Sequence, residues 1–96
     1  MEVFYDGKVK LKRKKDGFDT FKHIFSARIR DDEEIPFYVV EPDPYNIHFE
    51  KGWNLTAERL ILVGTAVLSS KDFIEKTMSE QMAYEKKKRV RQNGGD

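Results

Sequence analysis

An acidic segment is the first part of the sequence whose residues could carry chemistry. Residues 31–50 hold seven carboxylates and no Lys or Arg. The acids are Asp31, Asp32, Glu33, Glu34, Glu41, Asp43 and Glu50. Carboxylate oxygens are the ligands that Mg²⁺ and Ca²⁺ prefer. Consecutive acids point in different directions, however, and the spacing of an EF-hand loop is absent, so we expect a solvated turn that holds no metal or other cofactor.

The two histidines lack the spacing that a zinc site or a catalytic nucleophile requires. The chain has no cysteine, which excludes thiolate metal sites and cysteine nucleophiles. His23 is in step with Phe21 and Phe25, a pattern that indicates packing, whereas His48 alternates with polar neighbours. No glycine-rich phosphate loop is present either. The sequence therefore predicts a protein that is not an enzyme.

Positive charge is concentrated in two other blocks. Residues 8–15 carry six cations and residues 86–91 carry five, although the net charge is only +1. In a strand, Lys8, Lys10, Lys12 and Lys14 would share one face, with Val9 and Leu11 on the other. A basic row beside aromatic residues is typical of proteins that hold single-stranded nucleic acid. Lysines on an outer strand also prevent edge-to-edge aggregation, and the acidic segment can neutralise them across strands.

These blocks lead to the hypothesis of a small, non-enzymatic binding protein of bacterial, phage or other intracellular origin. Its most specific partner is nucleic acid. The residues expected to contact it are Lys8, Lys10, Lys12, Arg13, Lys14, Lys15, Lys22, Arg28, Arg30, Lys86, Lys87, Lys88 and Arg89. The alternative is an inhibitor or adaptor that uses the acidic segment to mimic a polyanion and fill a basic groove of another protein. A homodimer through the C-terminal helices fits either hypothesis.

Length and composition predict one domain over residues 1–91 and a mobile tail at 92–96. The chain has 96 residues, of which 39% are apolar and 36% charged, a balance typical of globular proteins. No apolar run approaches the length of a membrane span, and the first residues do not resemble a signal peptide. We therefore expect a cytoplasmic protein.

Short strands are expected over residues 2–50. Asp6-Gly7 is the pair that a type I′ turn prefers, which predicts a hairpin of residues 2–5 and 8–12. Alternation predicts further strands at 18–30, 35–41 and 45–49, although a helix over 18–30 would also bring its apolar residues together. Pro36 confines the start of the 35–41 strand to a sheet edge or to a strand end. The prediction is an α+β fold with an antiparallel meander of four to five strands.

The C-terminal part, residues 56–91, is expected to pack on this sheet. Residues 60–68 are apolar on all sides, so periodicity does not separate a helix from a strand. Thr56 as an N-cap and Glu58 in the first turn favour a helix. From Ser69, which resembles a cap, a stripe through Ile74 and Met78 predicts a second helix that can continue to residue 91.

The step from sheet to helix resembles one known family. Residues 51–58, with the sequence KGWNLTAE, follow the basic strands and precede a helix. This layout resembles that of a class of transcriptional coactivators. Members of that class bind single-stranded DNA on the sheet face as dimers packed through helices. The resemblance implies the order of the elements and assigns no individual residue.

Overall fold

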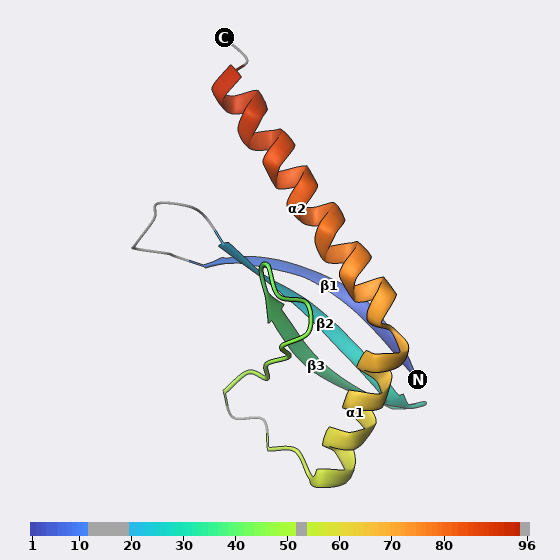
Figure 1. The fold of residues 1–96 in the computed structure, drawn as a ribbon. Helices are drawn as coiled ribbons and strands as arrows, with labels where there is room; N and C mark the ends of the chain where they lie inside the picture. Colours follow the sequence, from blue (N-terminus) through green and yellow to red (C-terminus); the bar gives the residue numbers. More distant parts are fainter. Residues whose placement is uncertain (12–19, 52–53, 95–96) are drawn as a thin grey trace.

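The computed structural model describes residues 1–11, 20–51 and 54–94, with the backbone alone for residues 86–94. Three strands form one antiparallel sheet in the order β1-β2-β3, and two helices follow (Figure 1). The elements are β1 (Glu2–Leu11), β2 (Thr20–Arg30), β3 (Glu33–Val40), α1 (Ala57–Ser69) and α2 (Lys71–Gly94). The predicted α+β class is confirmed, but four to five strands are not.

The hairpin predicted around Asp6-Gly7 is wrong. Residues 2–11 form a single strand that pairs with β2 along its whole length. A bulge between Tyr5 and Gly7 shifts the register of this pairing. Gly7 has a φ of 122°, a conformation that favours glycine, so the Asp-Gly pair serves a bulge here rather than a turn.

The bulge decides which side chains of β1 face the helices. Before it, Val3 and Tyr5 pair with core residues of β2. After it, Lys8 and Lys10 take the helix-facing positions, because the extra residue inverts the alternation. Val9 instead lies on the opposite side, which we call the open face of the sheet, and is 45% exposed. The lysines and Val9 do occupy opposite faces, but the lysines are the ones beside the helices.

The segment after β3 does not form the strand expected at 45–49. In the described part of the chain it makes one isolated bridge, in which Tyr38 and His48 exchange backbone hydrogen bonds of 2.9 and 2.8 Å. Pro42 and Pro44 have no N–H to donate to a longer ladder. Strand β3 lies at the edge of the three-stranded sheet, which is one of the two positions that Pro36 allowed.

The core lies between one face of the sheet and the two helices. Alternate residues of β2 and β3 are buried, which confirms the alternation read from the sequence. The buried apolar side chains are Val3, Phe25, Ala27, Ile29, Ile35, Phe37, Val39, Val63, Ala66, Ile74 and Met78. Phe25 is at their centre, stacked on Phe37 with 5.6 Å between ring centroids and edge-on to Phe73 at 6.2 Å.

Residues 60–68, for which periodicity did not separate a helix from a strand, lie in helix α1. The Thr56 side chain caps its N-terminus by accepting a hydrogen bond of 3.3 Å from the Arg59 N–H. Ser70 alone separates α1 from α2, and its N–H donates to the carbonyl groups of Ala66 and Val67. Ser69 is the last residue of α1, so it does not cap the second helix as expected.

Helix α2 is longer than the body that it packs on. Its apolar stripe buries Ile74 and Met78, near its start. Its last turns run beyond the sheet (Figure 1). The molecule accordingly measures 53 × 26 × 20 Å, and its radius of gyration is 15.3 Å. A compact chain of this length would have a radius of gyration of about 12.5 Å.

Candidate functional site

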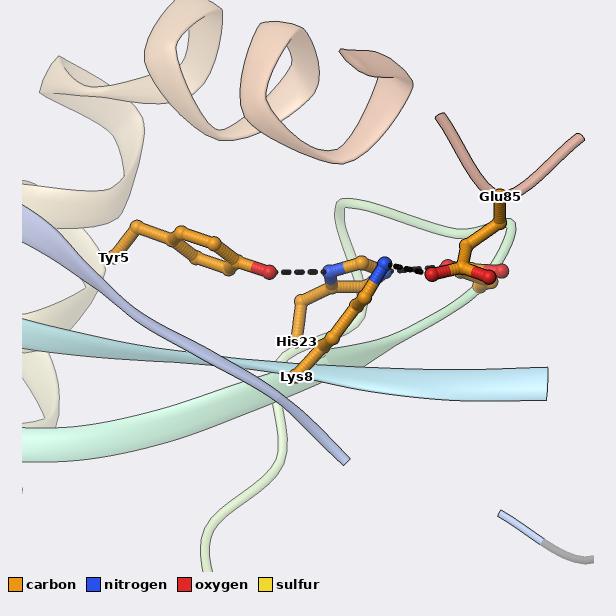
Figure 2. A network of polar contacts seen from close by, with 5 residues as sticks. Tyr5, Lys8, His23 and Glu85 are labelled. Atoms are coloured by element: carbon orange, nitrogen blue, oxygen red, sulfur yellow. Dashed lines mark hydrogen bonds and ion pairs between the residues drawn. The ribbon is translucent and has the colours of Figure 1, made fainter. Parts of the chain in front are cut away.

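A polar network lies on the helix-facing side of the sheet, where the apolar core ends (Figure 2). His23 of β2 is fully buried at its centre. Its Nδ1 is 3.1 Å from the Tyr5 hydroxyl, and its Nε2 is 2.5 Å from a carboxylate oxygen of Glu41. The network therefore joins β1, β2 and the residue that follows β3.

This arrangement makes His23 a structural cross-link. Both ring nitrogens have hydrogen-bond partners within the chain, and the ring is fully buried. Burial raises the pKa of the Tyr5 hydroxyl, and the nearby charge of Glu41 raises it further. Tyr5 thus keeps its proton at neutral pH. Within the described residues, no group of three or more His, Cys, Asp or Glu side chains is placed to hold a metal.

The sequence placed His23 on the packing face of its strand but did not identify its partners. Tyr5 and Glu41 are each 18 residues away from His23, and their meeting depends on the register of three strands. The expected packing position of His23 did indicate that polar partners were needed, because the ring nitrogens of a buried histidine must form hydrogen bonds.

A second contact lies beside this network, between Lys8 and Glu85 (Figure 2). The Lys8 Nζ is 2.5 Å from the Glu85 carboxylate. The same ammonium lies 4.8 Å from the centroid of the Phe21 ring and 5.5 Å from that of Tyr84. Both side chains of the ion pair are only about one-fifth exposed. This contact joins β1 to α2 across a sequence separation of 77 residues.

The other described cations of the predicted nucleic-acid site also have partners. Lys22 forms a 2.6 Å ion pair with Glu50, and Arg28 forms one of 2.7 Å with Glu34. The hydrogen bond to Glu34 is the main cause of a raised pKa of the Arg28 guanidinium. Arg30 pairs with Glu58 of α1. Lys10 is not free either.

The remaining predicted contacts cannot be compared with side-chain geometry. Lys12, Arg13, Lys14 and Lys15 lie outside the described residues. For Lys86, Lys87, Lys88 and Arg89 the structure gives the backbone, which is helical.

Three of the seven carboxylates of the acidic segment form described ion pairs with Lys or Arg. Besides the pairs of Glu34 and Glu50, Glu33 forms a 3.0 Å ion pair with Arg59 of α1. Glu41 binds His23, and Asp43 accepts a hydrogen bond of 2.9 Å from the Tyr45 N–H. Asp31 and Asp32 are exposed in the turn between β2 and β3. The described contacts therefore divide the segment into three ion-paired carboxylates, two hydrogen-bonded ones and two that are exposed in the turn.

Comparison with known proteins adds no relative. No family model, no curated protein and no solved structure matches this chain. Among the described helices, none is long and apolar enough to cross a membrane. A function is then inferred from the contacts and charges of the chain itself.

Proposed function

We propose that the chain is a small, non-enzymatic binding protein for nucleic acid, and that it binds through the end of the molecule where its two basic blocks begin. The observation that supports this is the Lys8–Glu85 ion pair. From this contact β1 continues to Leu11 and then to the basic residues 12–15, which enter the proposal by their sequence alone. Helix α2 continues from Glu85 into the basic residues 86–91.

This proposal uses the two basic blocks, which enter it by their sequence and, for residues 86–91, by their place on the backbone of α2. Residues 12–15 contain four cations and residues 86–91 contain five. Lys22, Arg28 and Arg30, in contrast, would have to leave Glu50, Glu34 and Glu58 before they could release counterions on a phosphate backbone. We therefore exclude these three residues from the proposed contact, although the sequence had grouped them with the others.

The open face of the sheet is a weaker candidate for the same partner. It carries Phe4 and Tyr38, and aromatic rings on a sheet can stack on bases. Each ring is already covered, since Arg28 lies 4.8 Å from the Phe4 centroid and Lys22 lies 4.6 Å from the Tyr38 centroid. The carboxylates that pair with these two cations add negative charge there. The polyanion-mimic alternative is also less well supported, because three of the seven carboxylates of the acidic segment form ion pairs within the chain.

A salt titration of binding to a labelled single-stranded oligonucleotide tests the proposal. Two variants neutralise the basic blocks: Lys12, Arg13, Lys14 and Lys15 all to Gln, and Lys86, Lys87, Lys88 and Arg89 all to Gln. If the four cations of a block contact phosphates, each variant flattens the log–log salt dependence by about 3 units, from about 0.7 per contact. The protein concentration should extend to about 100 μM, the range of non-specific binding.

The matched control replaces Lys22, Arg28 and Arg30 by Gln. It removes nearly as many charges, but all three come from existing ion pairs, so we expect a change in slope of less than about 1 unit. A control that loses as much as the block variants would place the contact on the sheet instead. No detectable binding of the wild-type chain at low salt would refute nucleic acid as the partner.

A further inference from the structure

The outward side of α1 is apolar where a surface helix is normally polar. Val63 and Ala66 face the core and are fully buried. On the opposite side of the helix, Ile61 is 69% exposed and Leu68 is 76% exposed. Gly64 and Thr65 lie between them in the sequence, so the middle of this side has no charged residue. We call Ile61, Gly64, Thr65 and Leu68 the outer stripe of α1.

Gly64 has no role within the chain that the described contacts explain. Its φ is not in the positive range, and a Cβ built on it would meet no atom within 4 Å. Glycine is nevertheless the least favourable helix residue apart from proline. In the middle of an exposed apolar stripe, a glycine lets a second helix approach closely.

The exposure of the outer stripe marks it as a surface for contact with another helix. Ile61 and Leu68 are the two most exposed large apolar side chains among the described residues. Contiguous exposed apolar side chains on a small protein are typical of interaction sites.

We propose that a second copy of this chain covers the outer stripe, with the two α1 helices antiparallel about a two-fold axis near Gly64 and Thr65. Ile61 and Leu68 are equally far from this centre, so each Ile61 lies against Leu68 of the other copy. The same patch then serves both copies, as a two-fold interface requires. No charged residue lies between the two contacts, so the centre of the interface buries no unpaired charge.

The same symmetry brings a further apolar residue to a pocket. Pro44, Tyr45, Val67, Leu68, Lys71 and Ile74 line a pocket of about 190 Å³ at the C-terminal end of α1. Leu60 is 47% exposed near the other end of the helix. In the antiparallel pair, Leu60 of one copy lies level with residue 69 of the other and on the side of the pocket. This proposal does not depend on nucleic-acid binding.

Cysteine cross-linking tests both the pairing and its direction, because the chain has no cysteine of its own. Ile61→Cys and Leu68→Cys are prepared separately, then oxidised alone and as an equal mixture. The antiparallel pair predicts a disulfide-linked dimer in the mixture only. Each variant alone fails because its two cysteines lie about 10 Å apart along the helices, seven residues at 1.5 Å each, which is too far for a disulfide. Cross-linking of each variant alone would refute the antiparallel pairing.

Sedimentation of the full chain from about 1 to 200 μM gives an independent measurement. We expect the mass to double from that of the 11.3 kDa monomer, and Leu68→Glu to keep the chain monomeric throughout. Val9→Glu is the matched control, since Val9 is an exposed aliphatic residue on the open face, and this variant should dimerise like the wild type. A wild-type chain that stays monomeric at the highest concentration would overturn the proposal.

Discussion

Replacing His23 by leucine tests whether the buried polar network holds the three strands together. Leucine is of similar size and keeps the site apolar, but it cannot bond to Tyr5 or Glu41. The Glu41 side chain is only 13% exposed, so its carboxylate loses a partner that water replaces incompletely. The His23→Leu variant should therefore be less stable than the wild type, although leucine is more hydrophobic than histidine.

The expected loss follows from the two bonds. A hydrogen bond to a charged group contributes about 1.5–3 kcal/mol, and one to a neutral hydroxyl contributes about 0.5–1.5 kcal/mol. Leucine recovers part of this through apolar burial, which leaves a net loss of about 2–3 kcal/mol. For a domain of this size that corresponds to a fall in Tm of about 10–20 °C.

Urea unfolding of a double-mutant cycle measures the interaction directly. The variants are His23→Leu, Glu41→Gln and the double variant, and we expect a coupling energy of about 1–2 kcal/mol. Arg28→Gln is the control, because the Arg28–Glu34 pair has side chains 43% and 45% exposed and should cost less than about 1 kcal/mol. A coupling energy within about 0.3 kcal/mol of zero would refute the structural role of the network.

Two other predictions concern pH and glycine. Because the pKa of Tyr5 is raised above its ordinary value of 10.0, folding favours its protonated form. This contribution is complete below about pH 10 and is lost as the pH rises through the raised pKa, so unfolding measured from pH 9 to 11 should show a decline in stability that Tyr5→Phe reduces. Gly7→Ala should destabilise the fold by about 1 kcal/mol or more because of its positive φ, whereas Gly64→Ala should stabilise the monomeric helix by about 0.5–1 kcal/mol. Thermal unfolding at low protein concentration checks this difference in sign, and equal effects of the two substitutions would contradict it.

Local patterns were sufficient to predict much of the fold. The alternation through Phe25 and Ala27 predicted β2, and Thr56 indicated the start of α1. The sequence could not distinguish the two structural uses of Asp6-Gly7, because a tight turn and a bulge both favour a glycine with positive φ. The structure therefore has one long strand where a hairpin was predicted. In this strand, Lys8 lies beside α2.

The candidate site was less predictable because it depends on contacts between distant residues. Lys8 was predicted as part of a basic row, and no local pattern indicated that Glu85 would pair with it. Their pairing follows from the strand register and from the path of α2, and local periodicity predicts neither of these. The ion pairs that neutralise Lys22 and Arg28 are likewise products of the tertiary fold.

The bulge in β1 also bears on how a chain of this kind can change by insertion and deletion. Loss of one codon at position 6 or 7 would let the alternation run unbroken through the strand. Val9 and Leu11 would then turn towards the helices, and Lys8 and Lys10 would turn to solvent. A point substitution changes one side chain, but this deletion would exchange the chemistry of half a strand between its two faces. A single three-nucleotide deletion would thus exchange the lysines and the apolar residues between the two faces of the second half of β1.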